Sequence, residues 1–146
     1  MDDISFTIPP GAKVGLCGRS GSGKSSLISA LLRLLDLSSG SIIIDGVDIA
    51  TLPRQEVRSR LIALPQDPYV LAGSIRDNVD PLHIVPDEEI CDALDKVELS
   101  HLLEDGGLDK QLTSDMLSHG QCQLLCLARA IVRKGSILVL DEATAR

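Results

Sequence analysis

The sequence predicts an α/β fold with a mostly parallel sheet, and three stretches of the chain lead to that prediction. Residues 13–17 form a short apolar strand, a glycine-rich loop follows it, and apolar residues then recur at helical spacing over 25–35. Residues 136–140 are a continuous apolar run, which is typical of strands buried in a parallel sheet. Asp45-Gly46 between two apolar runs indicates a β-hairpin, so we also expect an antiparallel β flap.

The other elements are predicted from periodicity and turn residues. Alternation of apolar and polar residues over 4–8 predicts a half-buried strand. Residues 51–60 predict a short helix, and residues 61–64 predict a strand. The helix expected over 122–133 is apolar nearly all the way round, which predicts that it is buried on every side.

Residues 74–109 indicate a small helical insert. An acidic helix start is followed there by residues that make one apolar face. The acidic runs 87–95 and 104–109 are expected to form a solvated face and not a partner surface. We therefore predict a single domain, with a core over 1–73 and 110–146 and this insert between the two parts.

Composition excludes several classes of protein. The 146 residues carry 14 basic and 21 acidic side chains, a net charge of −7, whereas a nucleic-acid surface needs to be basic. No apolar stretch reaches the ~20 residues that span a bilayer, and the acidic start is unlike a secretory signal peptide, so we expect the chain in the cytosol. The four cysteines lack the spacing of a metal site, and we expect reduced, mostly buried thiols.

Residues 18–25 fit the phosphate-binding pattern G-x-x-x-x-G-K-[ST] at every fixed position. The three glycines of the loop allow positive φ and a close approach of the backbone to an anion. Lys24 adds a positive charge, and Ser25 offers a hydroxyl to Mg²⁺. The alternative is a glycine-rich surface turn, which does not explain the strand before the loop and the helix behind it. The loop therefore predicts a triphosphate on a helix N-terminus.

Polar residues follow two of the predicted strands. Gln66 follows the strand at 61–64, and Asp141 and Glu142 follow the strand at 136–140. Ligands of open α/β sheets bind at the carboxyl ends of the strands. Asp141 is therefore a candidate Mg²⁺ ligand, and Glu142 is a candidate general base for an attacking water. The alternative is a polar cap that only marks the strand end.

Four motifs, in this order, resemble those of an ATP-binding-cassette (ABC) nucleotide-binding domain: GRSGSGKS at 18–25, LPQDP at 64–68, LSHGQ at 117–121 and ILVLDE at 137–142. The third motif distinguishes this family from other P-loop ATPases, because those share the first and the last motif but not the third. The resemblance covers essentially the whole chain and implies a P-loop NTPase core. Residues 64–68, 73–81 and 123–130 look like the second nucleotide-binding domain of subfamily C (multidrug-resistance-associated) transporters, in a form seen in fungi.

The resemblance implies a role for each motif residue, with ATP and Mg²⁺ as cofactors. The implied nucleotide-binding residues are Gly18, Arg19, Ser20, Gly21, Ser22, Gly23, Lys24, Ser25 and Ser26. The implied Mg²⁺ ligands are Ser25, Gln66 and Asp141. Glu142 would be the catalytic base, and Gln66 would join Mg²⁺ and water and report the nucleotide state to the transmembrane part.

The signature residues Ser118, His119, Gly120 and Gln121 are implied to close over a nucleotide held by an opposing domain. The implied partners are a second nucleotide-binding domain in a head-to-tail pair and the transmembrane domains of the same transporter, at the cytoplasmic face of a membrane. His119 stands where many members of the family have Gly, and a lone His is more often inert than functional.

Two features of the family are missing. No aromatic residue precedes Phe6 to stack on adenine, and the strand that carries the switch histidine would lie beyond Arg146. The resemblance therefore implies a domain cut at both ends and incomplete at its C-terminus. The chain would be either the ATPase motor of transmembrane export or a truncated remnant that binds nucleotide without turnover. A soluble cassette ATPase of DNA repair or translation would want a basic surface or coiled-coil heptads, which the sequence lacks.

Overall fold

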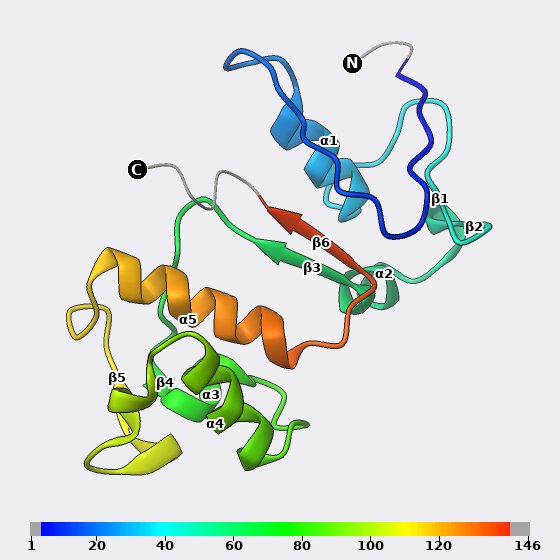
Figure 1. Cartoon of the computed structure of the whole chain (residues 1–146). Helices are drawn as coiled ribbons and strands as arrows, with labels where there is room; N and C mark the ends of the chain where they lie inside the picture. Colours follow the sequence, from blue (N-terminus) through cyan, green and yellow to red (C-terminus); the bar gives the residue numbers. More distant parts are fainter. Residues whose placement is uncertain (1–3, 141–146) are drawn as a thin grey trace. The chain divides into compact units, whose positions relative to one another are not determined.

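The computed structural model describes residues 4–140 (Figure 1). The chain divides into two compact units, residues 1–58 and residues 59–146. Asp141 and Glu142, which the sequence predicts to be functional, lie outside the described residues.

The first unit holds a helix and a short hairpin. The helix α1 is Lys24–Leu31, and the two strands are β1, Ile43–Ile44, and β2, Val47–Asp48. A 3-10 turn, η1, Ile49–Thr51, follows the strands. The helix α2, Arg54–Arg60, then leads into the second unit. β1 and β2 pair antiparallel, and the turn residues Asp45 and Gly46 have φ angles of 49° and 80°. Positive φ at both positions is what a type I′ hairpin turn requires. The predicted antiparallel flap is confirmed.

The helix α1 ends at Leu31, whereas its apolar spacing predicted a helix to Leu35. Arg33, two residues after the helix, has a φ of 52°, which breaks the helical path. The Arg58 side chain donates to the carbonyl oxygens of Leu32 and Arg33, both at 3.1 Å. A helix end needs such partners for its last carbonyl groups. The partner comes from a distant part of the sequence, so apolar spacing alone does not reveal this end.

The strands predicted over 4–8 and 13–17 are wrong. Neither segment belongs to a strand in the described part of the first unit. Ile4, Phe6 and Val14 remain 52%, 57% and 54% exposed. A strand needs the backbone groups of a neighbouring strand, and an alternating pattern does not say whether that neighbour is in place.

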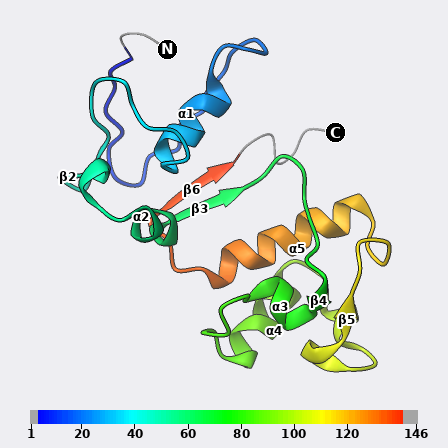
Figure 2. The same ribbon diagram turned by 180° about the vertical axis from the view of Figure 1, so that it is seen from behind.

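In the second unit, two strands confirm the predicted parallel sheet. β3, Leu61–Leu64, and β6, Ile137–Leu140, pair in parallel along their whole length, and Figures 1 and 2 show them side by side. Burial alternates along β6, because Ile137 and Val139 are half-buried while Leu138 and Leu140 are 52% and 55% exposed. The expectation that this strand is buried on both faces is therefore wrong. An apolar run does not say whether both faces are covered.

The rest of the second unit is mostly helical. A second, antiparallel pair joins β4, Gly73–Ser74, to β5, Gln111–Leu112. The helices are α3, Ile75–Val79, α4, Asp87–Lys96, and α5, His119–Val132, with 3-10 turns η2, Ser100–Leu103, and η3, Gly107–Asp109. α3 and α4 both pack on α5, and α5 contacts β3. The apolar face predicted for the acidic helix is confirmed, since Ile90, Ala93, Leu94 and Val97 are all buried.

The helix α5 begins with a capping box. The Ser118 hydroxyl accepts a hydrogen bond from the Gln121 backbone N–H at 3.2 Å, and the Ser118 backbone N–H donates to the Gln121 side-chain oxygen at 2.9 Å. One face of α5 is buried, with Leu125 and Ala128 fully inaccessible. The opposite face is not covered, because Leu124, Leu127 and Ile131 are 36–41% exposed. The prediction that α5 is buried all round is therefore wrong.

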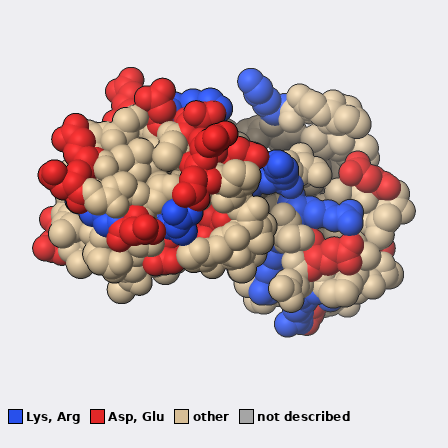
Figure 3. Space-filling model, turned by 90° about the horizontal axis from the view of Figure 1, so that it is seen from below, with Lys and Arg blue, Asp and Glu red and all other residues tan. Residues whose placement is uncertain are grey.

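The acidic runs form a solvated face, as predicted. Every Asp and Glu from 87 to 95 and from 104 to 109 is exposed. Figure 3 shows acidic side chains crowded over part of the molecular surface. The Arg76 guanidinium forms a two-pronged ion pair with Asp87 and lowers the pKa of that carboxyl below its usual value.

All four cysteines are free thiols, as predicted, but the expectation that most of them are buried is wrong, because Cys17 is exposed and Cys91 is half-buried. Cys122 and Cys126 are buried, and burial raises the pKa of the Cys122 thiol above its ordinary value.

Replacing Gly135 by Ala is expected to destabilise the chain by about 1–3 kcal/mol through overpacking. Gly135 joins α5 to β6, and a Cβ atom there would lie 2.5 Å from Cγ1 of Ile62 and 2.9 Å from the carbonyl oxygen of Arg60. Urea unfolding of the 146-residue chain measures the effect. The control is Gly120→Ala near the start of α5, where a Cβ atom meets nothing within 4 Å. Equal stability of the two variants would contradict this packing.

Replacing Ser118 by Ala is expected to cost about 0.5–2 kcal/mol, because the N-cap bond to the Gln121 backbone is lost. Ser118→Asn keeps a capping oxygen and should retain most of the stability. The midpoint of thermal unfolding, followed by circular dichroism, compares the two variants. If Ser118→Ala melts with the unchanged chain, the cap does not stabilise α5.

Candidate functional site

The loop 18–23 leads directly into α1 and contains the glycine geometry of an anion cradle. Gly21 and Gly23 have φ angles of 80° and 95°, which side chains rarely adopt. Gly18 is needed for a different reason, because a Cβ atom there would lie 2.5 Å from the Ser22 hydroxyl oxygen. Side chains at Gly21 and Gly23 would strain the backbone, and a side chain at Gly18 would require Ser22 to move.

The start of α1 has no side-chain cap. Gly23 occupies the N-cap position, and no side chain accepts from the first N–H groups of the helix, those of Lys24, Ser25 and Ser26. Uncapped N–H groups at a helix N-terminus favour an anion, through both hydrogen bonds and the helix dipole. The hydroxyl groups of Ser25 and Ser26 belong to exposed residues at the same end.

Lys24 folds back over this loop. Its ammonium nitrogen, Nζ, donates to the carbonyl oxygens of Gly18 at 2.7 Å and Arg19 at 3.2 Å. Both acceptors are neutral, so a phosphate oxygen would be a stronger partner for the same ammonium group. The residues present therefore fit a nucleotide phosphate: glycines that permit a tight loop, backbone donors without a side-chain cap and the ammonium group of Lys24.

Gln66 lies two residues after the end of β3 and is exposed. Since β3 and β6 are parallel and Leu64 is opposite Leu140, both strands end at the same edge of the sheet. Asp141 and Glu142 follow Leu140 in the sequence but lie outside the described residues. Of the three predicted Mg²⁺ ligands, Ser25 lies in the first unit and Gln66 in the second. Among residues 4–140, no group of three His, Cys, Asp or Glu side chains could hold a metal ion.

The signature residues lie on the first turn of α5, in the second unit. Ser118 and Gln121 cap each other, and the Gln121 amide also lies 3.4 Å from the His101 ring. The His119 ring lies 3.4 Å from the amide of Gln123 on the next turn. His119 thus has a local partner on its own helix, and Gly120 leaves open space where a side chain would stand.

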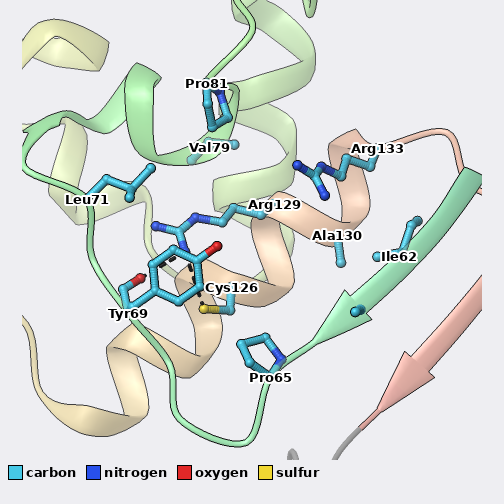
Figure 4. Close-up of a pocket in the computed structure, with 11 residues that line it drawn as sticks. Ile62, Pro65, Tyr69, Leu71, Val79, Pro81, Cys126, Arg129, Ala130 and Arg133 are labelled. Atoms are coloured by element: carbon cyan, nitrogen blue, oxygen red, sulfur yellow. Dashed lines mark hydrogen bonds between the residues drawn. The ribbon is translucent and has the colours of Figure 1, made fainter. Parts of the chain in front are cut away.

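A cavity of about 60 Å³ lies between β3, the chain that follows it, α3 and α5 (Figure 4). This volume is far below the ~300 Å³ at which ligand pockets begin, so the cavity does not hold a nucleotide. Its lining includes Tyr69 and Arg129, which lie close together. Sequence reasoning missed this pair, although both residues lie in or beside segments that carry the family resemblance.

The sequence model of the ABC transporter family matches residues 1–145. The chain is 55% identical over 145 residues to ABC transporter gloK of Glarea lozoyensis. The aligned region covers 99% of this chain and 11% of gloK. It is 54% identical over 145 residues to ABC multidrug transporter B of Aspergillus fumigatus, and the aligned region covers 99% of this chain and 10% of that protein. It is 47% identical over 148 residues to ABC transporter C family member 13 of Arabidopsis thaliana, and the aligned region covers 99% of this chain and 10% of that protein.

The chain thus spans about a tenth of the length of these curated relatives. Within residues 4–140, no helix has the length and apolar character to cross a membrane. The match over almost the whole chain and the phosphate-loop geometry agree with the α/β architecture of a P-loop NTPase. The chain therefore belongs to the ABC transporter family, as a nucleotide-binding domain similar to those of subfamily C.

Proposed function

We propose that this chain binds ATP with Mg²⁺ and hydrolyses it, and that this reaction powers export by an ABC transporter. The observation that carries the proposal is the phosphate loop, where Lys24 and the uncapped N-terminus of α1 face no anionic partner within the described residues. The relatives are transporters by name, and two of them come from fungi.

The phosphate loop binds the nucleotide. Residues 18–26 surround the phosphates, and Lys24 exchanges the carbonyl oxygens of Gly18 and Arg19 for phosphate oxygens. Ser25, Gln66 and Asp141 are the residues that would hold Mg²⁺, and the ion would supply positive charge to the phosphates. Glu142 accepts a proton from the attacking water, and Gln66 helps to orient that water.

The signature residues serve a second domain. Ser118 to Gln121 close over a nucleotide bound by the partner in a head-to-tail pair. The Ser118 oxygen already accepts from the Gln121 N–H, so its hydroxyl hydrogen remains available to donate to a phosphate. His119 is not assigned a catalytic role. Transmembrane domains of the same transporter are the other partners, and the chain works at the cytoplasmic face of the membrane.

Residues 74–109 act as a helical insert in a core formed by 1–73 and 110–146. No nucleic acid takes part, because the exposed surface of the insert is acidic and would repel phosphate backbones.

Replacing Lys24 by Ala is expected to weaken binding of a fluorescent ATP analogue with Mg²⁺ by about tenfold or more. The reason is that the variant loses a charge-assisted hydrogen bond to phosphate, and such a bond contributes about this much affinity. Lys13→Ala removes the same charge from an exposed residue outside the loop and should bind like the unchanged chain. Fluorescence titration of the three chains measures the dissociation constants. Unchanged affinity of Lys24→Ala would place the nucleotide site elsewhere.

Replacing Glu142 by Gln is expected to lower turnover by about 10²–10⁴-fold, because the amide cannot accept the proton. The variant should bind ATP as tightly as the parent, since shape is preserved. Phosphate release is measured in a full transporter that carries this chain, with Glu88→Gln on the exposed side of α4 as the matched control. Normal turnover by Glu142→Gln would assign the base to another residue, and binding without turnover by the parent would favour the nucleotide-binding remnant.

A further inference from the structure

The connection between α5 and β6, residues 133–136, holds a serine in a fixed and exposed position. Arg133 follows α5 with extended backbone angles, φ −80° and ψ 128°. The Ser136 backbone N–H donates to the Arg60 carbonyl oxygen at 2.9 Å, directly before β3 begins. Figures 1 and 2 show this connection reaching the start of β6 beside the start of β3. The backbone of Ser136 is therefore held in place, while the residue itself is exposed.

The Ser136 hydroxyl group makes no hydrogen bond within the described residues. Other serines of the second unit use their hydroxyl groups in the structure. Ser74 and Ser118 cap helices, and the Ser100 hydroxyl donates to the Asp95 carboxylate at 2.8 Å. The hydroxyl of Ser136 supports no element in this way, so it is available for a reaction at the surface.

Two cations precede this serine, in a stretch without acidic residues. No Asp or Glu occurs in the sequence from 116 to 140, although the chain carries 21 acidic side chains. Arg133 and Lys134 lie three and two residues before Ser136, and both are exposed. Within the described residues, neither side chain forms an ion pair or a hydrogen bond. Their charges are therefore available to carboxylates of a partner.

Arg129, one turn earlier on α5, shows how a structural arginine is used in this fold. Its Nη1 donates to the Tyr69 carbonyl oxygen and its Nη2 donates to Oδ1 of Asn78, both at 2.8 Å. Arg133 lines the same cavity, but its donors are unused within the described chain. A free guanidinium can form a two-pronged pair with a carboxylate, which an ammonium group cannot reproduce. Arg133 therefore fits a recognition role better than a structural one.

The residues around Ser136 form a pattern that one class of enzyme recognises. Basic side chains three and two residues before a serine, with an apolar residue directly after it, suit the acidic and apolar subsites of basophilic protein kinases. Ile137 is the apolar residue here. We propose that Ser136 is a phosphorylation site for a serine/threonine protein kinase of this class, with Arg133 as the main recognition residue. This proposal goes beyond the proposed function and does not depend on nucleotide binding by this chain.

Only a small part of the fold has to open for a kinase to bind the segment in extended form. Residues 133–135 lie outside the helices and strands of the described chain. The bond from the Ser136 N–H to Arg60 and the pairing of Ile137 with Leu61 lie at the end of a four-residue strand. The ends of such elements open locally at a low free energy. Phosphorylation of Ser136 therefore does not require the chain to unfold.

The reaction transfers one phosphoryl group from the MgATP that the kinase holds. The Ser136 oxygen forms a bond to the γ-phosphorus, the bond from that phosphorus to the β,γ-bridging oxygen breaks, and ADP leaves. The hydroxyl proton passes to the catalytic aspartate of the kinase. The product carries a charge of about −1.5 to −2 at pH 7. This charge lies at the start of β6, whose other end leads to Asp141.

The first arm of the test locates the phosphate. The 146-residue chain is incubated with MgATP and the catalytic subunit of cyclic-AMP-dependent protein kinase, a basophilic enzyme, and mass spectrometry identifies the modified residues. Ser136 should be the main site, and Ser136→Ala should lose most of the incorporated phosphate. Ser59→Ala is the matched control, because Ser59 is also exposed beside arginines but has Glu56 three residues before it. Absence of phosphate from Ser136 in the unchanged chain would overturn the proposal.

The second arm tests recognition through Arg133. Arg133→Gln should lower the initial rate of phosphorylation by about tenfold or more, because the charge-assisted pair with a kinase carboxylate is lost. Lys96→Gln removes one positive charge from an exposed position on α4 and should react like the unchanged chain. If Arg133→Gln and the unchanged chain react at the same rate, Arg133 is not the recognition residue.

The third arm shows whether the folded chain is the substrate. The phosphorylated chain should keep its circular dichroism spectrum and a thermal midpoint within about 3 °C of the unmodified chain, because the phosphate meets Lys134 and no carboxylate close to it in the sequence. Phosphate found by size-exclusion chromatography only in unfolded or aggregated chain would overturn the site in the native fold. The mass spectrum of the unchanged chain keeps the test decisive where Ser136→Ala is unfolded. A negative result in any arm leaves the proposed function standing, since no arm measures nucleotide binding by this chain.

Discussion

The second unit depends on the burial of one face of α5. Leu125 and Ala128 have no exposed surface, and α3, α4 and β3 all contact this helix. Complete burial of a leucine contributes about 1.5–3 kcal/mol, so a few such residues account for much of the net stability of a small domain. Elements that are far apart in the sequence are held together because each covers part of the same apolar face.

This packing also determines where the functional residues of the second unit lie. The capped start of α5 carries the signature residues, and its other end leads through Gly135 to β6, after which Asp141 and Glu142 follow. β3 contacts α5 and precedes Gln66. Hydrogen bonds of Asn78 and Arg129 fix the position of α3 and of the chain at Tyr69 against α5, which apolar contacts alone do not specify because they have no preferred direction.

The phosphate loop of the first unit is a local structure. Positive φ at Gly21 and Gly23, the close approach of Gly18 to Ser22 and the bonds from Lys24 to the loop all connect residues that are near in the sequence. Such a loop depends little on distant packing. It can therefore be read directly from the order of its residues, and its geometry agrees with the chemistry that the motif predicts.

The sequence by itself determined the features that rest on neighbouring residues: the Asp45-Gly46 turn, the apolar face of α4 and the phosphate loop. The roles of Gln66, Asp141, Glu142 and the signature residues remain predictions, drawn from motifs and family resemblance. Tertiary structure alone decided the end of α1, the absence of strands at 4–8 and 13–17, the uncovered faces of α5 and β6, and the meeting of Tyr69 with Arg129. The physical reason is that periodicity and turn chemistry act over a few residues, whereas burial and strand pairing depend on which distant partner is present.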